Sequence, residues 1–228
     1  MAKKVLVVDD EKLIVKGIRF SLEQDGMEVT CAYDGEEALL CAKEQNFDMI
    51  LLDIMLPKLS GTEVCQQIRE FSDVPIVMLT AKNDDMDKIM GLEYGADDYI
   101  TKPFNSLELV ARVKSAIRRY KQYNNYKTDE EKIYIDGLEI CKEQHKCLLY
   151  DKEIDLTPIE FDILLYLASK KGEVVSSEEL FEKVWKEKYL DNNNTVMVHI
   201  RRIREKLKED TKNPKYIKTV WGVGYKIE

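Results

Sequence analysis

The stretch MILLD, at Met49–Asp53, decides the architecture of the first half of the chain. Its first four residues are apolar, and so is all of PIVML at residues 75–79. A strand with water on one face alternates apolar and polar side chains, whereas a strand covered on both faces is apolar throughout. Both stretches therefore predict central strands of a parallel sheet that has helices on its two faces.

Three further strands are predicted at residues 4–8, 28–32 and 98–101, and helical patterns lie between the strands. One of these patterns is the apolar series Ile14, Ile18 and Leu22, which recurs every four residues. Five strands that alternate with helices indicate an α/β fold, a doubly wound five-stranded parallel sheet over residues 1–120.

A polar segment at residues 121–131 has no apolar period and is predicted to be a linker. Residues 132–228 then predict an α+β domain, which opens with short alternating segments typical of a small antiparallel sheet. Three helix starts follow, at Thr157-Pro158, at Ser176 and at Asn194-Thr195. The chain ends in a predicted β-hairpin whose turn contains Gly222.

The charges are divided unevenly along the chain. Residues 1–120 carry 15 Lys and Arg against 22 Asp and Glu, a net of −7, whereas residues 199–226 carry nine against three, a net of +6. The acidic first 120 residues and the basic stretch near the end predict two different functions, and nucleic-acid binding is predicted for the basic stretch.

The cysteines and the apolar runs indicate a cytoplasmic protein. No apolar run approaches the roughly 18 residues that a membrane span needs. The five cysteines form no CxxC pair and no His/Cys metal pattern, and we expect small buried side chains in a reducing compartment. They are Cys31, Cys41, Cys65, Cys141 and Cys147.

Polar residues stand where the predicted parallel strands end, which is where such sheets carry their functional sites. They are Asp9 and Asp10, Asp53, Thr80 and Lys102. Three converging carboxylates repel one another unless a cation lies between them, and hard oxygen ligands of this kind suit Mg²⁺. We interpret Asp53 as a nucleophile that becomes an aspartyl-phosphate, with the hydroxyl and the ammonium beside it holding phosphoryl oxygens.

The first 120 residues resemble the CheY-like receiver domain of two-component response regulators. The matching motifs are VVDDE at 7–11, LDIMLP at 52–57, Gly61, MLTA at 78–81 and GADDYITKPF at 95–104. The resemblance implies that Asp53 accepts a phosphoryl group from a sensor histidine kinase and that Tyr99 is a switch residue which moves with Thr80.

The same resemblance implies a ligand set for magnesium. Asp10, Asp53 and the backbone carbonyl of Met55 would bind Mg²⁺ directly, and Asp9 would act through water. Lys102 would bind the phosphoryl group, and the Lys102–Pro103 peptide bond is expected to be cis.

The third helix of the second half has an apolar stripe, which includes Val196, Ile200 and Ile203, and a cationic opposite side. This division suits a helix that lies in the DNA major groove. A charged face of this kind is also common on helices that simply face water. No acidic residue occurs among residues 211–227, which favours the interpretation as a DNA-binding helix.

The second half resembles the winged-helix DNA-binding domain of the OmpR/PhoB subfamily. The matching motifs are LTPIEF at 156–161, Val184-Trp185, TVMVHIRRIR at 195–204 and TVWGVGY at 219–225. The resemblance places Met197, Val198 and Arg202 at base edges. It places phosphate contacts at Trp185, Asn194, His199, Arg201, Arg204 and Thr219.

Trp221 departs from the pattern of this subfamily, because many members carry an arginine in the wing that reaches the minor groove. Trp221 is retained as a DNA-binding residue, but it brings no positive charge to that position. The tail at residues 213–228 looks especially like that of the vancomycin-resistance regulators.

The resemblance also implies partners. Phosphorylation would produce a homodimer, with Lys88 of one copy against Glu108 of the other, and Asp98 against Arg112. Double-stranded promoter DNA, the sensor kinase and RNA polymerase are the other expected partners, and no membrane partner is expected.

Two other interpretations stay open. A phosphatase of the haloacid dehalogenase type also uses an aspartyl nucleophile, but such sites usually carry a second aspartate two residues later, where this chain has Met55. Alternatively, the second half binds a protein rather than DNA. A P-loop nucleoside triphosphatase is excluded, since the chain lacks GxxxxGK[ST].

Overall fold

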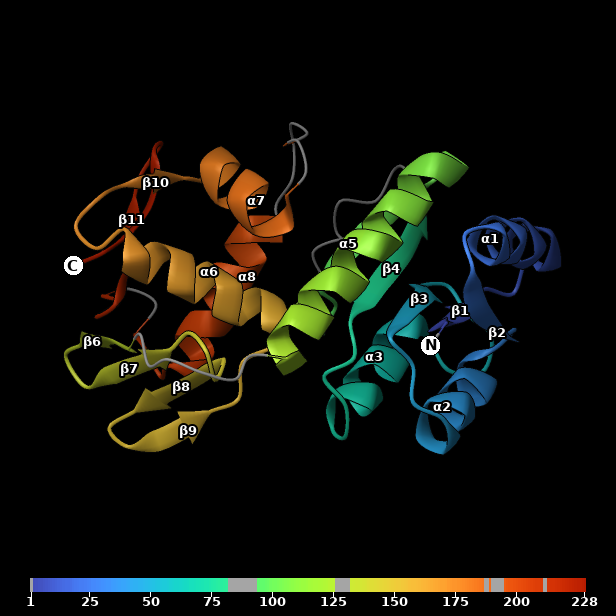
Figure 1. Ribbon diagram of the computed structural model, residues 1–228, viewed down its shortest axis with the longest axis horizontal. Helices are drawn as coiled ribbons and strands as arrows, with labels where there is room; N and C mark the ends of the chain where they lie inside the picture. The colour runs from blue at the N-terminus through green and yellow to red at the C-terminus, as the bar shows by residue number, and fades with distance from the viewer. Residues whose placement is uncertain (1, 82–93, 126–131, 187–188, 190–194, 211–212) are drawn as a thin grey trace. The chain divides into compact units, whose positions relative to one another are not determined.

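A computed structural model describes residues 2–81, 94–125, 132–186, 189, 195–210 and 213–228. The chain divides into two compact units, Met1–Tyr120 and Lys121–Glu228. The helices and strands of both units carry the labels of Figure 1.

The first unit contains a five-stranded sheet in which all neighbouring strands are parallel, in the order β2-β1-β3-β4-β5. The strands are β1 (Lys3–Val8), β2 (Met27–Ala32), β3 (Met49–Asp53), β4 (Ile76–Ala81) and β5 (Asp98–Lys102). The predicted five-stranded parallel sheet is confirmed. The strand order reverses between β1 and β3, and the ends of strands on either side of such a reversal form a ligand site in open parallel sheets.

Helices cover both faces of this sheet, as its apolar central strands predict. They are α1 (Lys12–Gln24), α2 (Gly35–Glu44), α3 (Gly61–Arg69) and α5 (Ser106–Asn125). One core joins Val15 and Ile18 of α1 and Val113 of α5 to the strand residues Val5 and Leu51. Figure 1 shows α2 and α3 on the other side of the sheet from α1 and α5.

The predicted linker begins inside a helix. Helix α5 continues to Asn125, five residues beyond the expected domain end at residue 120. Nothing between Ser106 and Asn125 is glycine or proline, so a polar sequence continues the helix there instead of ending it. Residues 126–131 of the expected linker lie outside the described part of the chain.

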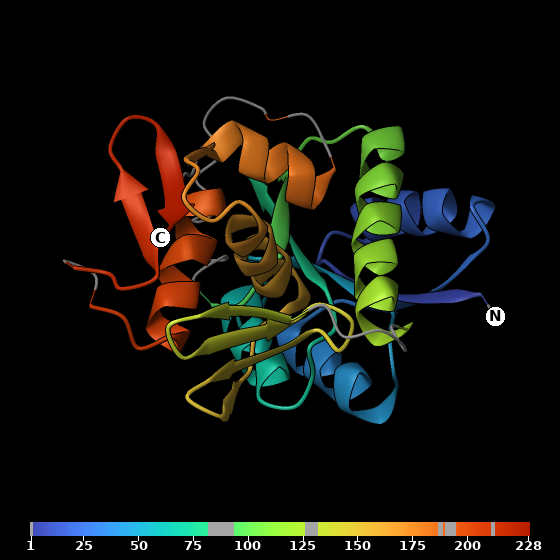
Figure 2. The same ribbon diagram turned by 60° about the vertical axis from the view of Figure 1, so that its left-hand side comes forward.

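The second unit has two antiparallel sheets and three described helices. The first sheet runs in the order β6 (Lys132–Ile135), β7 (Leu138–Cys141), β8 (Lys146–Leu149) and β9 (Lys152–Ile154). The second has the order β10 (Val175–Ser176), β12 (Gly224–Ile227) and β11 (Ile217–Val220). The expected antiparallel sheet and the expected hairpin are both present, and Figure 2 shows β11 and β12 as the red hairpin. Strand β10 was not expected.

The helices of the second unit surround a single apolar core. They are α6 (Pro158–Ser169), α7 (Ser177–Trp185) and α8 (Thr195–Lys206). Phe161, Phe181, Ile200 and Ile217 are among the buried residues of this core, so it joins all three helices to the hairpin. No helix in the described part of the chain is long and apolar enough to cross a membrane.

Candidate functional site

Three carboxylates meet where β1 and β3 end. Oxygen atoms of Asp9, Asp10 and Asp53 all lie within 4.8 Å of one another. Asp9 and Asp53 are buried, whereas Asp10 is exposed, so the cluster is open to water on one side. The structure thus brings together the three acidic residues that the strand ends predicted, at the point where the strand order reverses.

Lys102, at the end of β5, is the cation of this cluster. Its Nζ atom lies 2.7 Å from Asp9 Oδ2 and 3.2 Å from Asp53 Oδ1. Burial disfavours the charged ammonium, but the interactions with Asp9 and Asp53 outweigh this cost and raise the pKa of Lys102. The side chain therefore stays a cation beside the two buried carboxylates.

Asp53 is an unusual carboxylate. The pKa of Asp53 is raised to about 6, mostly by burial and in smaller part by Asp9 and Asp10, while Lys102 acts in the opposite direction. Only 5% of Asp53 is exposed. A bound cation would favour the ionised form, which is the form that can attack phosphorus.

The remaining predicted residues of this site lie on β4, on β5 and in the loop after β3. Thr80 is buried at the end of β4, beside Thr101 of β5 in register, and Tyr99 is half-buried in β5. Met55 follows Asp53 by two residues and is 73% exposed. The Lys102–Pro103 bond is cis, as expected.

Gly61 holds the loop after β3 close to α3, a role that the sequence motif alone did not reveal. A Cβ atom on Gly61 would come within 1.9 Å of the backbone oxygen of Asp53. The Gly61 amide donates to the Ile54 carbonyl at 2.9 Å. Any side chain at this position would displace the backbone that carries Asp53.

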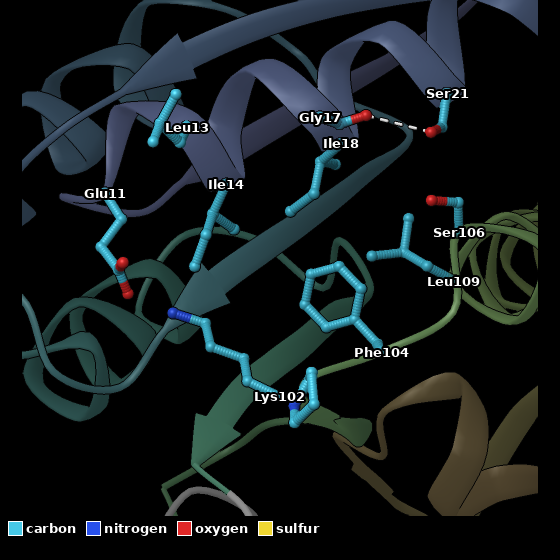
Figure 3. Close-up of a pocket in the computed structure, with 11 residues that line it drawn as sticks. Glu11, Leu13, Ile14, Gly17, Ile18, Ser21, Lys102, Phe104, Ser106 and Leu109 are labelled. Atoms are coloured by element: carbon cyan, nitrogen blue, oxygen red, sulfur yellow. Dashed lines mark hydrogen bonds between the residues drawn. The ribbon is translucent and has the colours of Figure 1, made fainter.

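A hollow of about 500 Å³ lies between α1 and the start of α5, beside the acidic cluster. Figure 3 shows Ile14 and Ile18 of α1 and Phe104 and Leu109 lining it, with Lys102 at its edge. Lys102 is thus shared by an apolar hollow and an acidic cluster. Leu13, which also lines the hollow, is 85% exposed.

Helix α8 of the second unit presents few of its residues to water. Met197 is 50% exposed, and Arg201 is exposed and pairs with Glu205 along the helix at 3.0 Å. Val198 and His199 are buried instead. The predicted basic helix is therefore present, but only part of the predicted contact surface faces outward.

Arg202 lies in a buried ion-pair cluster with Glu160 and Lys206. Glu160, in the first turn of α6, has no exposed surface, and Arg202 is 9% exposed. Glu160 Oε1 lies 2.9 Å from Arg202 Nη2, and Oε2 lies 2.7 Å from Lys206 Nζ. Oε2 also accepts a hydrogen bond from the Thr157 amide at 2.9 Å, so one carboxylate both caps α6 and holds α8.

The two cations decide the charge state of Glu160. Burial alone would raise its pKa, but Arg202 and Lys206 more than offset this, and the pKa of Glu160 is lowered. Arg202 was expected to face a base edge, whereas here its guanidinium is turned inward. The apolar period identifies the buried stripe of α8, but it gives no sign that a carboxylate of α6 faces the neighbouring residues.

Arg204 links α8 to the hairpin. Its Nη2 atom donates to the Ile217 carbonyl at 2.7 Å and to Thr219 Oγ1 at 2.8 Å. Two residues expected at phosphates, Arg204 and Thr219, therefore contact each other, and Arg204 is only half-buried.

Trp185 and His199 are inside the unit, although both were expected at phosphates. Neither side chain has any exposed surface, and their rings lie 5.5 Å apart. Trp185 also stacks on Phe181 at 4.8 Å. These two side chains cannot reach a phosphate from the positions that they occupy here. Asn194, another expected phosphate contact, lies outside the described residues.

The residues of the expected dimer face are paired within one chain. Arg112 of α5 lies 3.1 Å from Asp98 and 3.3 Å from Glu108. Lys88, expected to meet Glu108 of a second copy, lies outside the described residues.

Two family models match the chain. The response regulator receiver domain matches residues 5–114, and the C-terminal domain of transcriptional regulatory proteins matches residues 151–227.

Relatives and a solved structure are similar over the full length. The regulatory protein VanRc of Enterococcus gallinarum is 55% identical, with both chains covered completely. The alkaline phosphatase synthesis regulator PhoP of Bacillus subtilis (strain 168) is 45% identical over 100% of this chain and 98% of that protein. The crystal structure of DrrB, an OmpR/PhoB homologue of Thermotoga maritima, is 37% identical with a TM-score of 0.52, and the match covers 100% and 99% of the two chains.

Proposed function

Because the chain belongs to the two-component response regulators with an OmpR/PhoB-type DNA-binding domain, we propose that Asp53 is the residue whose phosphorylation controls its transcriptional function. The observation that carries this assignment is the position of Asp53 among Asp9, Asp10 and Lys102. It is the buried carboxylate at the end of a central strand, and it has a cation beside it.

The acidic residues fit a magnesium ion. Asp10, Asp53 and the Met55 carbonyl would hold Mg²⁺, and Asp9 would act on it through water. Bound Mg²⁺ neutralises the carboxylates and the oxygens of the incoming phosphoryl group. Hard oxygen donors around an open position are the ligands that this ion prefers.

The residues around Asp53 then carry out the transfer. A carboxylate oxygen of Asp53 attacks phosphorus, the P–N bond of the donor histidine breaks, and the leaving imidazole takes a proton from water. Lys102 turns from the carboxylates to a phosphoryl oxygen, and Thr80 donates to another. Tyr99 follows Thr80 inward and changes the surface near β5.

Labelling by a small phosphodonor tests the assignment. With Mg²⁺, intact-mass spectrometry should find one phosphoryl group on the wild type and none on Asp53→Asn, and chelation of the metal should abolish labelling. Asp25→Asn is the matched control, since Asp25 pairs with Lys114 at 2.7 Å elsewhere on the same unit. Equal labelling of Asp53→Asn would contradict the proposal.

The sensor histidine kinase contacts the hollow between α1 and α5. A donor that reaches Asp53 has to cover the surface next to Lys102, and the apolar lining there suits a protein partner. Leu13→Glu should slow phosphorylation by the kinase and leave labelling by a small phosphodonor unchanged. Equal slowing in both reactions would indicate damage to the acidic site instead.

Phosphorylation produces a homodimer through the face that carries β5 and α5. Arg112 leaves its in-chain partners Asp98 and Glu108 for Asp98 of a second copy, and Lys88 pairs with Glu108 of that copy. Exposed ion pairs are each worth about 0–1 kcal/mol, so several must act together. Sedimentation should show that Arg112→Asp stays monomeric with a phosphodonor, whereas Lys114→Asp dimerises.

The second unit binds double-stranded promoter DNA with α8 in the major groove. Met197 and Arg201 are the outward residues, and Arg204, Thr219 and Asn194 complete the proposed contact region, whereas the buried Val198, Trp185 and His199 support α8 from inside the unit. Trp221, which is 90% exposed, is a further proposed contact. A dimer brings two such helices to half-sites about 10–11 base pairs apart. Selection from a random-sequence DNA pool tests this, because enrichment of no motif would favour a protein-binding role.

Arg202 reads a base by leaving Glu160. Glu160 keeps a cation during this exchange, because Lys206 remains on the same carboxylate, 2.7 Å from Oε2.

The dimer acts on transcription through RNA polymerase in the cytoplasm. Transcription in vitro with purified polymerase should respond to phosphodonor and should not respond with Asp53→Asn.

A further inference from the structure

An ion pair joins the loop after β3, at residues 54–60, to the start of α2. Lys58 Nζ lies 2.6 Å from Asp34 Oδ2 and 3.4 Å from Glu36 Oε2. Asp34 and Glu36 stand at the start of α2, whereas Lys58 belongs to the loop that follows Asp53. The ion pair therefore ties the loop that leaves the acidic cluster to a neighbouring helix.

The carboxylate of Asp34 acts on both sides of this contact. Its Oδ1 atom accepts a hydrogen bond from the Glu37 amide at 2.8 Å and so caps α2, while its Oδ2 atom pairs with Lys58. The side chain of Asp34 is only 18% exposed. The hydrogen bond between the two side chains lowers the pKa of Asp34 and raises the pKa of Lys58. A capped helix end thus offers the loop a partner with a fixed position.

Backbone contacts hold the same part of the loop against α2. The Gly35 amide donates to the Pro57 carbonyl at 3.4 Å. A Cβ atom on Gly35 would come within 2.0 Å of the Leu59 carbonyl oxygen, so the two backbones touch and a side chain at residue 35 would force them apart. The backbone of the loop is therefore seated on α2 on either side of Lys58.

The backbone at Lys58 has a conformation that neighbouring contacts have to maintain. The Leu59 amide donates to the Pro57 carbonyl at 2.9 Å, and the φ of Lys58 between them is +68°. A three-residue turn of this kind is rare and strained for residues other than glycine. The ion pair to Asp34 supplies a stabilising contact at the strained residue itself.

Met55 lies between two fixed points of this loop. At the base, the Gly61 amide donates to the Ile54 carbonyl at 2.9 Å, and beyond Met55 the loop is held by Lys58 on α2. The Met55 side chain is 73% exposed, so packing of that side chain does not position its backbone. The two fixed points consequently set the position of the Met55 carbonyl, which is the proposed backbone ligand of Mg²⁺.

We propose that Lys58, through Asp34, is a positioning residue that holds the loop after β3 ready to bind Mg²⁺. This inference rests on the proposed Mg²⁺ site of the first unit. Without the ion pair, the loop has more conformations in the free protein, and ordering it becomes a cost of metal binding. Lys58 therefore affects the affinity for the metal and not the attack by Asp53 once the metal is bound.

A titration with Mg²⁺ alone, followed by the amide NMR signals of the first unit, measures this affinity without a phosphodonor. Lys58→Met removes the cation but keeps a long side chain, and Asp34→Asn removes the charge but keeps a good helix-capping residue. Each variant should bind Mg²⁺ about threefold more weakly, which is within the range of an exposed ion pair. Lys58→Arg keeps the cation and should bind Mg²⁺ as the wild type does.

The double variant distinguishes a shared contact from two unrelated contributions. If Lys58 and Asp34 act through each other, the variant that combines Lys58→Met with Asp34→Asn binds Mg²⁺ as weakly as either single variant and no more weakly. Losses that multiply in the double variant would overturn the proposal. Lys114→Met is the matched control, because the Lys114 side chain is also 54% exposed and also pairs with an aspartate, Asp25, at 2.7 Å. This control should keep the wild-type affinity.

The rate of labelling by a small phosphodonor is a second measurement. In Lys58→Met, the Mg²⁺ concentration that gives half of the maximal rate should rise about threefold. The rate at saturating Mg²⁺ should equal that of the wild type. A lower maximal rate with an unchanged half-saturating concentration would assign Lys58 to the transfer step and overturn the proposal.

The two levels of the inference fail differently. If Mg²⁺ does not support labelling of Asp53 in the wild type, the proposed function of the first unit is wrong. If the wild type is labelled and Lys58→Met binds Mg²⁺ with wild-type affinity, only the positioning role of Lys58 is wrong.

Discussion

The two units each bury a cluster of charged side chains, and the two clusters have opposite charge balance. In the first unit, the carboxylates of Asp9, Asp10 and Asp53 lie together, and the ammonium of Lys102 pairs with Asp9 and Asp53. In the second unit, the single carboxylate of Glu160 is held by Arg202 and Lys206. The first cluster has an excess of negative charge, and the second has an excess of positive charge.

The pKa values of two buried carboxylates are consequently shifted in opposite directions. Burial raises the pKa of Asp53 to about 6, because one lysine does not offset burial and two neighbouring aspartates. Glu160 is at least as buried, yet its two cations overcome the effect of burial and lower its pKa. Burial acts to raise both pKa values, and the balance of neighbouring charges decides the direction of the net shift.

This difference in charge balance also indicates which charged groups each cluster can bind. A site with excess negative charge gains from a cation and then from a phosphoryl group that the cation and Lys102 share. A cluster with a surplus cation can release one side chain toward an anion such as DNA without leaving its carboxylate bare.

Removal of the Glu160 carboxylate should have the largest effect. Glu160→Ala leaves Arg202 and Lys206 facing each other without a counterion and removes a cap of α6. Loss of one partner from a buried ion pair typically costs about 3–5 kcal/mol. Urea unfolding followed by fluorescence of the buried Trp185 reports on this unit.

Glu205→Ala is the control for this variant, because the exposed Glu205–Arg201 pair lies on the same helix. Its loss should stay within about 1 kcal/mol. If both variants unfold at the same urea concentration, the buried cluster does not stabilise the unit.

Lys102→Ala should have a smaller effect, and on dimerisation instead of on the stability of the fold. The three carboxylates remain, so Mg²⁺ binding and labelling of Asp53 should persist, but the phosphoryl group loses its charged partner. Hydrogen bonds to charged groups contribute roughly 1.5–3 kcal/mol, so phosphorylation-dependent dimerisation should weaken by about tenfold or more. Sedimentation with and without phosphodonor measures this, with Lys114→Ala as the control. Normal dimerisation of phosphorylated Lys102→Ala would show that Lys102 does not couple the two events.

The sequence predicts the helices and strands that carry both clusters, but it predicts the residues of only the first cluster. The apolar strands at 49–53 and 75–79 require cover on both faces, and this places Asp53, Thr80 and Lys102 at one edge of a sheet. No comparable rule connects Glu160 with Arg202, since these residues lie far apart in sequence and on different helices. The capping motif at Thr157 explains the position of Glu160 in the first turn of α6, but not its burial against α8.

The other differences between the predicted and the observed elements have similar physical causes. Helix α5 runs past the expected boundary because nothing in its polar end breaks a helix. Strand β10 is two residues long, too short for an alternating pattern to appear. The close approach of Gly61 to Asp53 follows from the path of the loop between β3 and α3, and this path is set by tertiary contacts.

Acid should weaken the second unit through Glu160. Its pKa is lowered in the folded state, so its contribution to stability is complete above the unfolded-state pKa of about 4.3 and is lost as the pH falls through the folded value. Unfolding followed through Trp185 should therefore show stability that declines below about pH 4.3. Glu160→Gln should be less stable at neutral pH and should flatten this decline. An equally steep acid decline in Glu160→Gln would assign it to other carboxylates.

The smallest predicted effect concerns Lys206, which should influence DNA recognition without touching DNA. In the wild type, Lys206 stays on Glu160 when Arg202 leaves for a base. In Lys206→Met, the departure of Arg202 leaves Glu160 buried without any cation, so Arg202 should stay on Glu160 and the preference for the selected duplex over scrambled DNA should narrow. The loss of preference should be a fraction of the roughly 1–3 kcal/mol that a bidentate arginine contact to guanine is worth.

Lys208→Met is the matched comparison, because Lys208 is exposed just beyond α8. It should act by charge alone, so its loss should weaken binding to both DNAs alike. Titration of both variants against the two duplexes separates the roles, and an unchanged preference in Lys206→Met would mean that Arg202 does not exchange Glu160 for a base.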